Sequence, residues 1–116
     1  MSKDILFLLA PGFEDNDRRE FCPECAELWG VLSYFPAIKE ALDIQYVDIE
    51  HPRAPICDFL GDGKWNAPTL ILADGVETSN LSGVRVDRGK SHLGSARDIA
   101  KYFAQKYGTP MPRGSR

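Results

Sequence analysis

The first hydrophobic segment of the chain, residues 5–10, is continuous, short and followed at once by a Pro-Gly pair. A run of this kind predicts a strand that is buried on both faces, as in a parallel sheet. Residues 13–21 are mostly polar or charged, which predicts a loop that is long for so small a domain. Apolar residues then recur every three or four positions over residues 22–35, which predicts a helix, with Pro23 just inside its start.

The hydrophobic pattern predicts five shorter elements in the middle of the chain. In order, these are a helical piece, a strand, one or two helical turns and two further strands, at residues 37–42, 43–50, 56–60, 69–73 and 84–87. We expect the second strand of the chain to run parallel to the first, because a helix separates them. The fourth strand is antiparallel to the third if residues 74–83 form a hairpin loop.

The last helix carries the clearest local signals. Ser95 and Asp98 form a capping box ahead of an apolar face with helical spacing, and Gly108 ends the pattern. The predicted order is β-α-β-α-β-β-α, an α/β fold in which a βαβ unit is followed by a β-hairpin and a closing helix. This order gives a four-stranded mixed sheet with helices on both faces. We expect one domain over residues 1–108 and a flexible tail over residues 109–116.

Composition and charge exclude several classes of protein. The chain has 116 residues, of which 43% are apolar, enough for the core of one domain. The net charge is −3 without a basic stripe, so no nucleic-acid partner is expected. The apolar run at residues 5–10 is too short to cross a bilayer or to form the core of a signal peptide. We therefore expect a cytoplasmic protein with no membrane partner.

The candidate chemistry lies in the run Cys22-Pro23-Glu24-Cys25, where the loop ends and the helix begins. Backbone N–H groups at a helix start point outward and carry roughly half a positive charge, which stabilises a thiolate. Cys25 lies three residues further on the same helical face, within reach of a disulfide to Cys22. We expect Cys22 to be the exposed attacking thiol and Cys25 the buried resolving thiol.

A structural zinc half-site is the alternative interpretation of the cysteine pair. Zinc normally takes four protein ligands in such sites, and the remaining candidates are Cys57, His51 and His92. Neither histidine belongs to a second spaced pair, so we favour thiol chemistry and expect no metal. Cys57 alone is interpreted as a small buried apolar residue.

The run Asn66-Ala67-Pro68-Thr69, just before the third predicted strand, is the second candidate site. Together with the Cys-Pro-x-Cys run, it makes the chain resemble the thioredoxin superfamily, and in size the glutaredoxins. The resemblance implies that Pro68 follows a cis bond and packs against the cysteine pair. It also implies that Ala67, Pro68 and Thr69 bind substrate, with the backbone of Ala67 pairing with an extended segment. Residues 7–13 and 30–36 are also similar to a small group of uncharacterised bacterial proteins with this fold.

The leading hypothesis is therefore a thiol–disulfide oxidoreductase that acts on a protein disulfide or a glutathione mixed disulfide. It would need no cofactor, although glutathione could serve as a cosubstrate, and it would be a monomer or a weak dimer. One alternative is a thioredoxin-fold binding module whose cysteines hold a metal or an iron–sulfur cluster. The other is a non-catalytic interaction domain.

Overall fold

The structure is a computed structural model that describes residues 3–114. Its helices and strands follow in the order β1 (Asp4–Leu9), β2 (Phe13–Asp15), β3 (Arg18–Glu20), α1 (Pro23–Tyr34), α2 (Pro36–Glu40), β4 (Leu42–Val47), α3 (Ala54–Leu60), β5 (Thr69–Ile71), β6 (Arg85–Asp87), β7 (Lys90–Leu93) and α4 (Ala96–Tyr107). Within this described part, no helix is long and apolar enough to span a bilayer.

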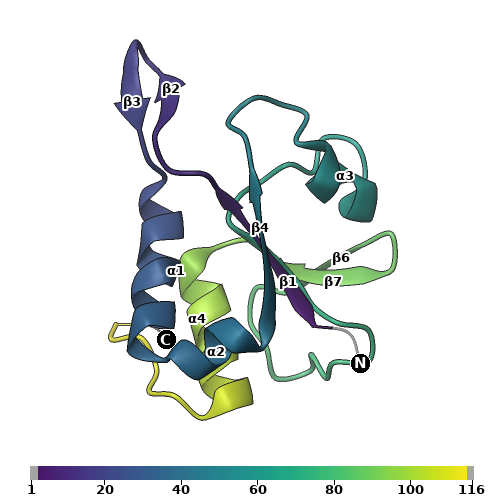
Figure 1. Cartoon of the computed structure of the whole chain (residues 1–116). Coiled ribbons are helices and arrows are strands. Elements are labelled where there is room, and N and C mark those ends of the chain that lie inside the picture. Colours follow the sequence, from purple (N-terminus) through teal and green to yellow (C-terminus); the bar gives the residue numbers. More distant parts are fainter. Residues whose placement is uncertain (1–2, 115–116) are drawn as a thin grey trace.

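The main sheet is mixed and has five strands in the order β4-β1-β5-β7-β6 (Figure 1). Strand β1 runs parallel to β4 and antiparallel to β5, and β7 is antiparallel to both β5 and β6. Leu6, Phe7 and Leu8 of β1 are completely buried. The predicted doubly buried first strand and its parallel partner are thus confirmed.

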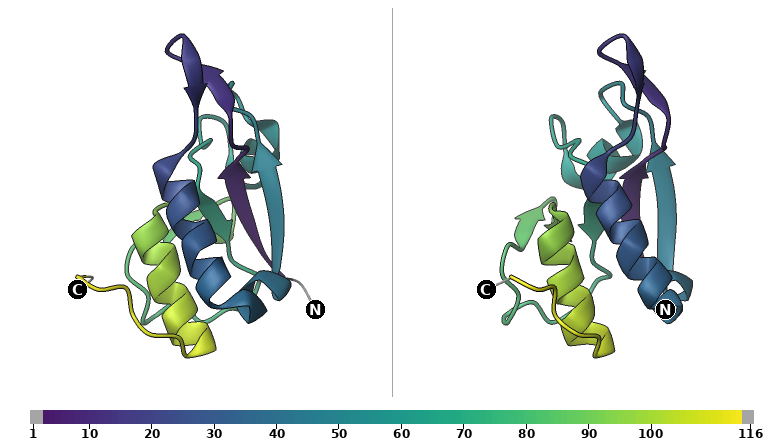
Figure 2. Two further views of the ribbon diagram at one scale, coloured as in Figure 1. Left: turned by 60° about the vertical axis from the view of Figure 1, so that its left-hand side comes forward. Right: turned by 90° about the vertical axis from the view of Figure 1, so that its left-hand side faces the viewer.

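The two faces of the sheet are covered unequally. Helices α1 and α4 lie side by side over one face (Figure 2), whereas α3 lies over the other. Phe7 faces α3, because its ring contacts Phe59 with the centroids 6.1 Å apart. Phe7 pairs with Thr69 in the register of the sheet, so Thr69 lies on the same face. Helix α3 has only seven residues and covers only part of this face.

The prediction of a four-stranded sheet is wrong, because the sheet has five strands. Residues 85–87 form a strand close to the predicted place, but this strand lies at the edge and pairs with β7 rather than with β5. On the side away from β1, the neighbour of β5 is β7, which the sequence analysis left outside the sheet. Arg88 and Gly89 both have positive φ and form the two-residue turn between the two strands.

The predicted loop over residues 13–21 is instead a small hairpin made of β2 and β3. Asn16 and Asp17 form its turn, both with positive φ, as a tight hairpin turn requires. The hairpin projects from the body of the molecule immediately before α1 (Figure 1). At its base, Gly12 has φ +83°, a backbone conformation that residues with a side chain rarely adopt, and it lies against the guanidinium of Arg19.

The other predicted elements form with small changes at their ends. Helix α1 follows the N-cap Cys22, and α4 follows the N-cap Ser95, whose hydroxyl accepts a hydrogen bond from the backbone N–H of Asp98. Residues 109–114 run back along α4, where Arg97 donates to the carbonyl of Arg113 at 3.4 Å. Residues 115–116 of the predicted tail lie outside the described residues.

A buried carboxylate ties the first strand to the last helix. Asp4, at the start of β1, is only 1% exposed and accepts hydrogen bonds from the backbone N–H of Ala73 at 2.7 Å and from the hydroxyl of Tyr102. Lys106 forms an ion pair with the same carboxylate at 3.2 Å. Burial, and then the hydrogen bond to Asp4, raise the pKa of Tyr102, so the phenol stays protonated as the donor.

We predict that Asp4→Ala destabilises the fold by about 2–4 kcal/mol, because a buried N–H and a buried hydroxyl lose their acceptor. The free energy of unfolding in urea measures this change. Asp43→Ala is the matched control, because Asp43 is an exposed aspartate on the neighbouring strand β4. The control should stay within about 0.5 kcal/mol of the parent protein. Equal losses in the two variants would contradict the role given to Asp4.

Candidate functional site

The cysteine pair lies at the first turn of α1, as the sequence predicts. Cys22 is the N-cap residue, and its Sγ accepts a hydrogen bond from the backbone N–H of Cys25 at 3.2 Å. Cys22 is partly exposed, whereas Cys25 is only 4% exposed, and neither is in a disulfide. The expected division into an accessible thiol and a buried thiol is therefore present in the fold.

The environment of Cys25 keeps it protonated at neutral pH. Burial, followed by the hydrogen bond with Cys22, raises the pKa of Cys25 to about 12. The backbone N–H of Leu9 lies 3.5 Å from Cys25 Sγ, and this hydrogen bond lowers the pKa of Cys25 by a smaller amount. Strand β1 thus ends directly against the buried thiol.

Glu24, between the two cysteines, reaches across to the last helix. Its Oε1 accepts a hydrogen bond from the backbone N–H of Ala96 at 3.1 Å, at the N-terminus of α4. A carboxylate is stabilised there by the unpaired N–H groups and the helix dipole. This contact joins the start of α1 to the start of α4, and it holds a negative charge beside the cysteine pair.

The Ala67-Pro68-Thr69 segment leads into β5. The Ala67–Pro68 peptide bond is cis, as predicted, and Pro68 is buried. Its contact with the cysteine pair stays a prediction. Thr69 Oγ1 donates to the carbonyl of Asn66 at 2.6 Å, so this hydroxyl serves the local turn. Asn66 holds the segment to the end of β7 through a 2.8 Å bond to the carbonyl of Gly94.

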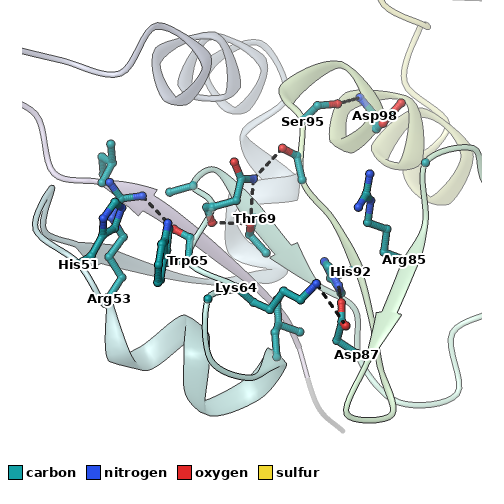
Figure 3. A pocket seen from close by; sticks show the side chains of 17 residues that line it. His51, Arg53, Lys64, Trp65, Thr69, Arg85, Asp87, His92, Ser95 and Asp98 are labelled. Carbon is teal, nitrogen blue, oxygen red and sulfur yellow. Dashed lines mark hydrogen bonds and ion pairs between the residues drawn. The ribbon is translucent and has the colours of Figure 1, made fainter.

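Ala67 and Thr69 also line a cleft of about 740 Å³ on the α3 side of the sheet, which we call the sheet cleft. Leu9 borders the same cleft, so the cysteine pair lies near one end of it. The charged, polar and aromatic side chains that line it include His51, Arg53, Lys64, Trp65, Arg85, Asp87, His92, Ser95 and Asp98 (Figure 3). Of these, the sequence analysis considered only the two histidines, Ser95 and Asp98, and it did not bring them together.

A hydrogen-bonded cluster occupies the floor of the sheet cleft. His92 Nε2 lies 2.8 Å from Asp87 Oδ2, and Lys64 Nζ lies 3.7 Å from the other oxygen of the same carboxylate (Figure 3). The hydrogen bond to His92, against a smaller opposing effect of burial, lowers the pKa of Asp87. The carboxylate is therefore ionised at neutral pH and holds both neighbours in place.

The described residues do not assemble a metal site. Within residues 3–114, no three side chains of His, Cys, Asp or Glu come together in a group that could hold a metal ion. Cys57, one of the candidate ligands, donates its Sγ hydrogen to the carbonyl of Pro52 at 3.0 Å. His51 instead stacks on Trp65 with the ring centroids 4.4 Å apart.

Fold and site together define an α/β protein with a mixed five-stranded sheet and a Cys-Pro-Glu-Cys run at the start of its first long helix. Residues 3–111 match the family model described as "Protein of unknown function (DUF3088)". The chain therefore belongs to this family. No curated protein and no solved structure gives a significant match.

We predict that iodoacetamide modifies Cys22 in the folded protein at pH 8 and leaves Cys25 unmodified. A pKa of about 12 leaves Cys25 with a thiolate fraction of about one in ten thousand at this pH, and the side chain is also buried. Mass spectrometry of peptides after a timed reaction measures both sites. Cys57, also buried, is the internal control and should react only after unfolding. Faster labelling of Cys25 than of Cys22 would contradict the assignment.

Proposed function

We propose that this protein is a thiol–disulfide oxidoreductase in which Cys22 attacks and Cys25 resolves. The observation that carries the proposal is the hydrogen bond from the backbone N–H of Cys25 to Cys22 Sγ, with the buried Cys25 thiol beside it. A thiolate on Cys22 keeps this donor and gains from the helix start. The dithiol is thus arranged for two consecutive exchange steps.

In the first step, the Cys22 thiolate attacks one sulfur of a substrate disulfide. The substrate S–S bond breaks, a mixed disulfide forms on Cys22, and the departing thiolate takes a proton from solvent. Cys25 then loses its proton and attacks Cys22 Sγ, which releases the second substrate thiol and leaves a Cys22–Cys25 disulfide. Two electrons have passed from the protein to the substrate, and two molecules of a thiol such as glutathione can return them.

The arrangement of the elements in the α/β fold supports this proposal. Strands β4-β1-β5-β7 form a mixed sheet with α1 and α4 on one face and α3 on the other, which is compatible with the βαβ unit, hairpin and closing helix that the resemblance implies. In this interpretation β6 is an added edge strand. Within residues 3–114, no hydrogen bond uses the backbone N–H or carbonyl of Ala67. These groups remain available to pair with an extended substrate segment.

The projecting hairpin favours a protein disulfide as substrate. Strands β2 and β3 extend the surface immediately before Cys22, beyond the end of the main sheet (Figure 2). Phe21, between this hairpin and Cys22, is 61% exposed. An exposed aromatic ring beside a nucleophile offers contact area to a folded partner rather than to a tripeptide alone.

We predict that Cys22→Ser abolishes reduction of an insulin disulfide by the pre-reduced protein, whereas Cys25→Ser forms a mixed disulfide that persists. The reason is that the first variant lacks the attacking sulfur and the second lacks the resolving sulfur. Turbidity measures insulin reduction, and non-reducing mass spectrometry measures the trapped species. Cys57→Ser is the control and should retain activity. Wild-type activity in Cys22→Ser would overturn the proposal.

Glu24 gives a separate prediction about the reduction potential. Replacing Glu24 with Gln removes a negative charge beside Cys22 but keeps an oxygen acceptor for the N–H of Ala96. The Cys22 thiolate, and with it the reduced form, should gain ~1 kcal/mol in this partly exposed site. The potential should therefore become less negative by about 20 mV, measured by equilibration with a glutathione buffer.

Glu27→Gln is the matched control for this measurement. Glu27 lies two residues beyond Cys25, and Arg97 already pairs with it at 3.2 Å. Its replacement should shift the potential by less than the replacement of Glu24. An equal shift in both variants would show that general surface charge, rather than Glu24, sets the potential.

A further inference from the structure

The sheet cleft exists because α3 is too short to cover its face of the sheet. Seven residues of α3 pack over the side of the sheet formed by β4 and β1, where Phe59 meets Phe7. Beyond them, the side chains that β7 and β6 place on this face are polar. Ile71 pairs with His92, and His92 pairs with Arg85, so His92 and Arg85 lie on the open face.

Arg85 offers an unused guanidinium to this cleft. Arg85 lies on the edge strand β6 and lines the cleft, and its guanidinium makes no hydrogen bond or ion pair with any other part of the described chain (Figure 3). Arg53, across the cleft, is already engaged, because its three nitrogens donate to the carbonyls of Asp48, Ile49 and Trp65. Arg85 therefore retains all five of its N–H donors for a ligand.

A second cation is loosely held nearby. Lys64 approaches Asp87 only to 3.7 Å, and Asp87 has its shorter contact with His92. The Lys64 ammonium can therefore turn towards a ligand without leaving Asp87 unpaired. The cleft lining carries three cationic side chains, Arg53 included, against the two carboxylates of Asp87 and Asp98, and this excess of positive charge favours an anion.

One wall of the sheet cleft is aromatic. His51 and Trp65 stack nearly parallel, with an interplanar angle of 25°, and Trp65 is 36% exposed. In Figure 3 this stack lies across the cleft from Arg85. The cleft thus offers a flat apolar surface on one side and charged donors on the other, which suits a planar organic acid.

We propose that the sheet cleft binds a small organic anion, with its carboxylate or phosphate on Arg85 and Lys64 and its apolar body against Trp65. A guanidinium forms two parallel hydrogen bonds with either kind of group. The proposal does not rest on the cysteine chemistry, since none of these three residues lies on the helix that carries the cysteines. Binding should therefore persist in the Cys22→Ser/Cys25→Ser double variant.

The test uses benzoate, phenyl phosphate and the neutral benzamide as probes on the full chain. The two tryptophans give separate indole N–H signals in a nitrogen-15 correlation spectrum, Trp65 in the cleft and Trp29 on α1 as the internal reference. We expect a saturable shift of the Trp65 signal with at least one of the two acids, weaker at high salt, and no saturable shift with benzamide. The tighter of the two acids identifies the anionic group.

Arg85→Gln should weaken this binding ~10-fold or more, because it removes the charged donors. Arg88→Gln is the matched control, since Arg88 lies in the adjoining turn and outside the cleft lining, and it should bind as the parent does. Thermal unfolding confirms that both variants are folded. The proposal is overturned if neither acid shifts Trp65 saturably, if benzamide binds equally well, or if Arg85→Gln binds unchanged.

Discussion

The central position of β1 is the constraint on which the rest of the structure depends. This strand is paired on both edges and buried on both faces, so its backbone cannot shift without breaking two ladders of hydrogen bonds. Its first residue, Asp4, fixes the last helix through Tyr102 and Lys106. Its last residue, Leu9, lies against the buried thiol of Cys25. One strand therefore positions the closing helix at one end and the cysteine pair at the other.

The unequal covering of the sheet follows from the helices that pack on it. Two twelve-residue helices, α1 and α4, shield one face, whereas α3 has seven residues and leaves part of the other face open. A polar floor at that place lowers the stability of the fold, because each apolar side chain buried there instead would stabilise the folded state by about 1.5–3 kcal/mol. The hydrogen bond between His92 and Asp87 offsets the free-energy cost of taking the histidine out of water. It does not supply the stability that a buried apolar side chain would add. A purely structural sheet would favour an apolar floor under a longer helix.

The sequence predicted those elements whose signals are local. Helix α4 has a capping residue, a periodic apolar face and a terminal glycine, and all three were visible in the chain. Strand β7 was missed because residues Lys90 to Leu93 lack the alternation of apolar and polar residues that marks a half-buried strand. One of its two buried residues, His92, is polar and faces the cleft. The adjacent Asn16 and Asp17 were the signal in the sequence for the first hairpin, since these residue types tolerate the positive φ that they adopt in its turn. The cleft could not be found in this way, because its side chains come from positions as far apart as His51 and Asp98 and meet only in the folded sheet.

The start of α4 relates the two candidate sites to each other. Glu24 accepts the N–H of Ala96 on the side of the cysteines, while Ser95, the preceding residue, lines the sheet cleft. At the opposite border, Leu9 and Ala67 line the cleft, and Leu9 also touches Cys25. The end of β1, the entry to β5 and the start of α4 therefore lie between the thiol pair and the polar floor of the sheet cleft. Leu9 and Ala96 are buried, so at these two points the distance between the sites is fixed by the core rather than by exposed loops.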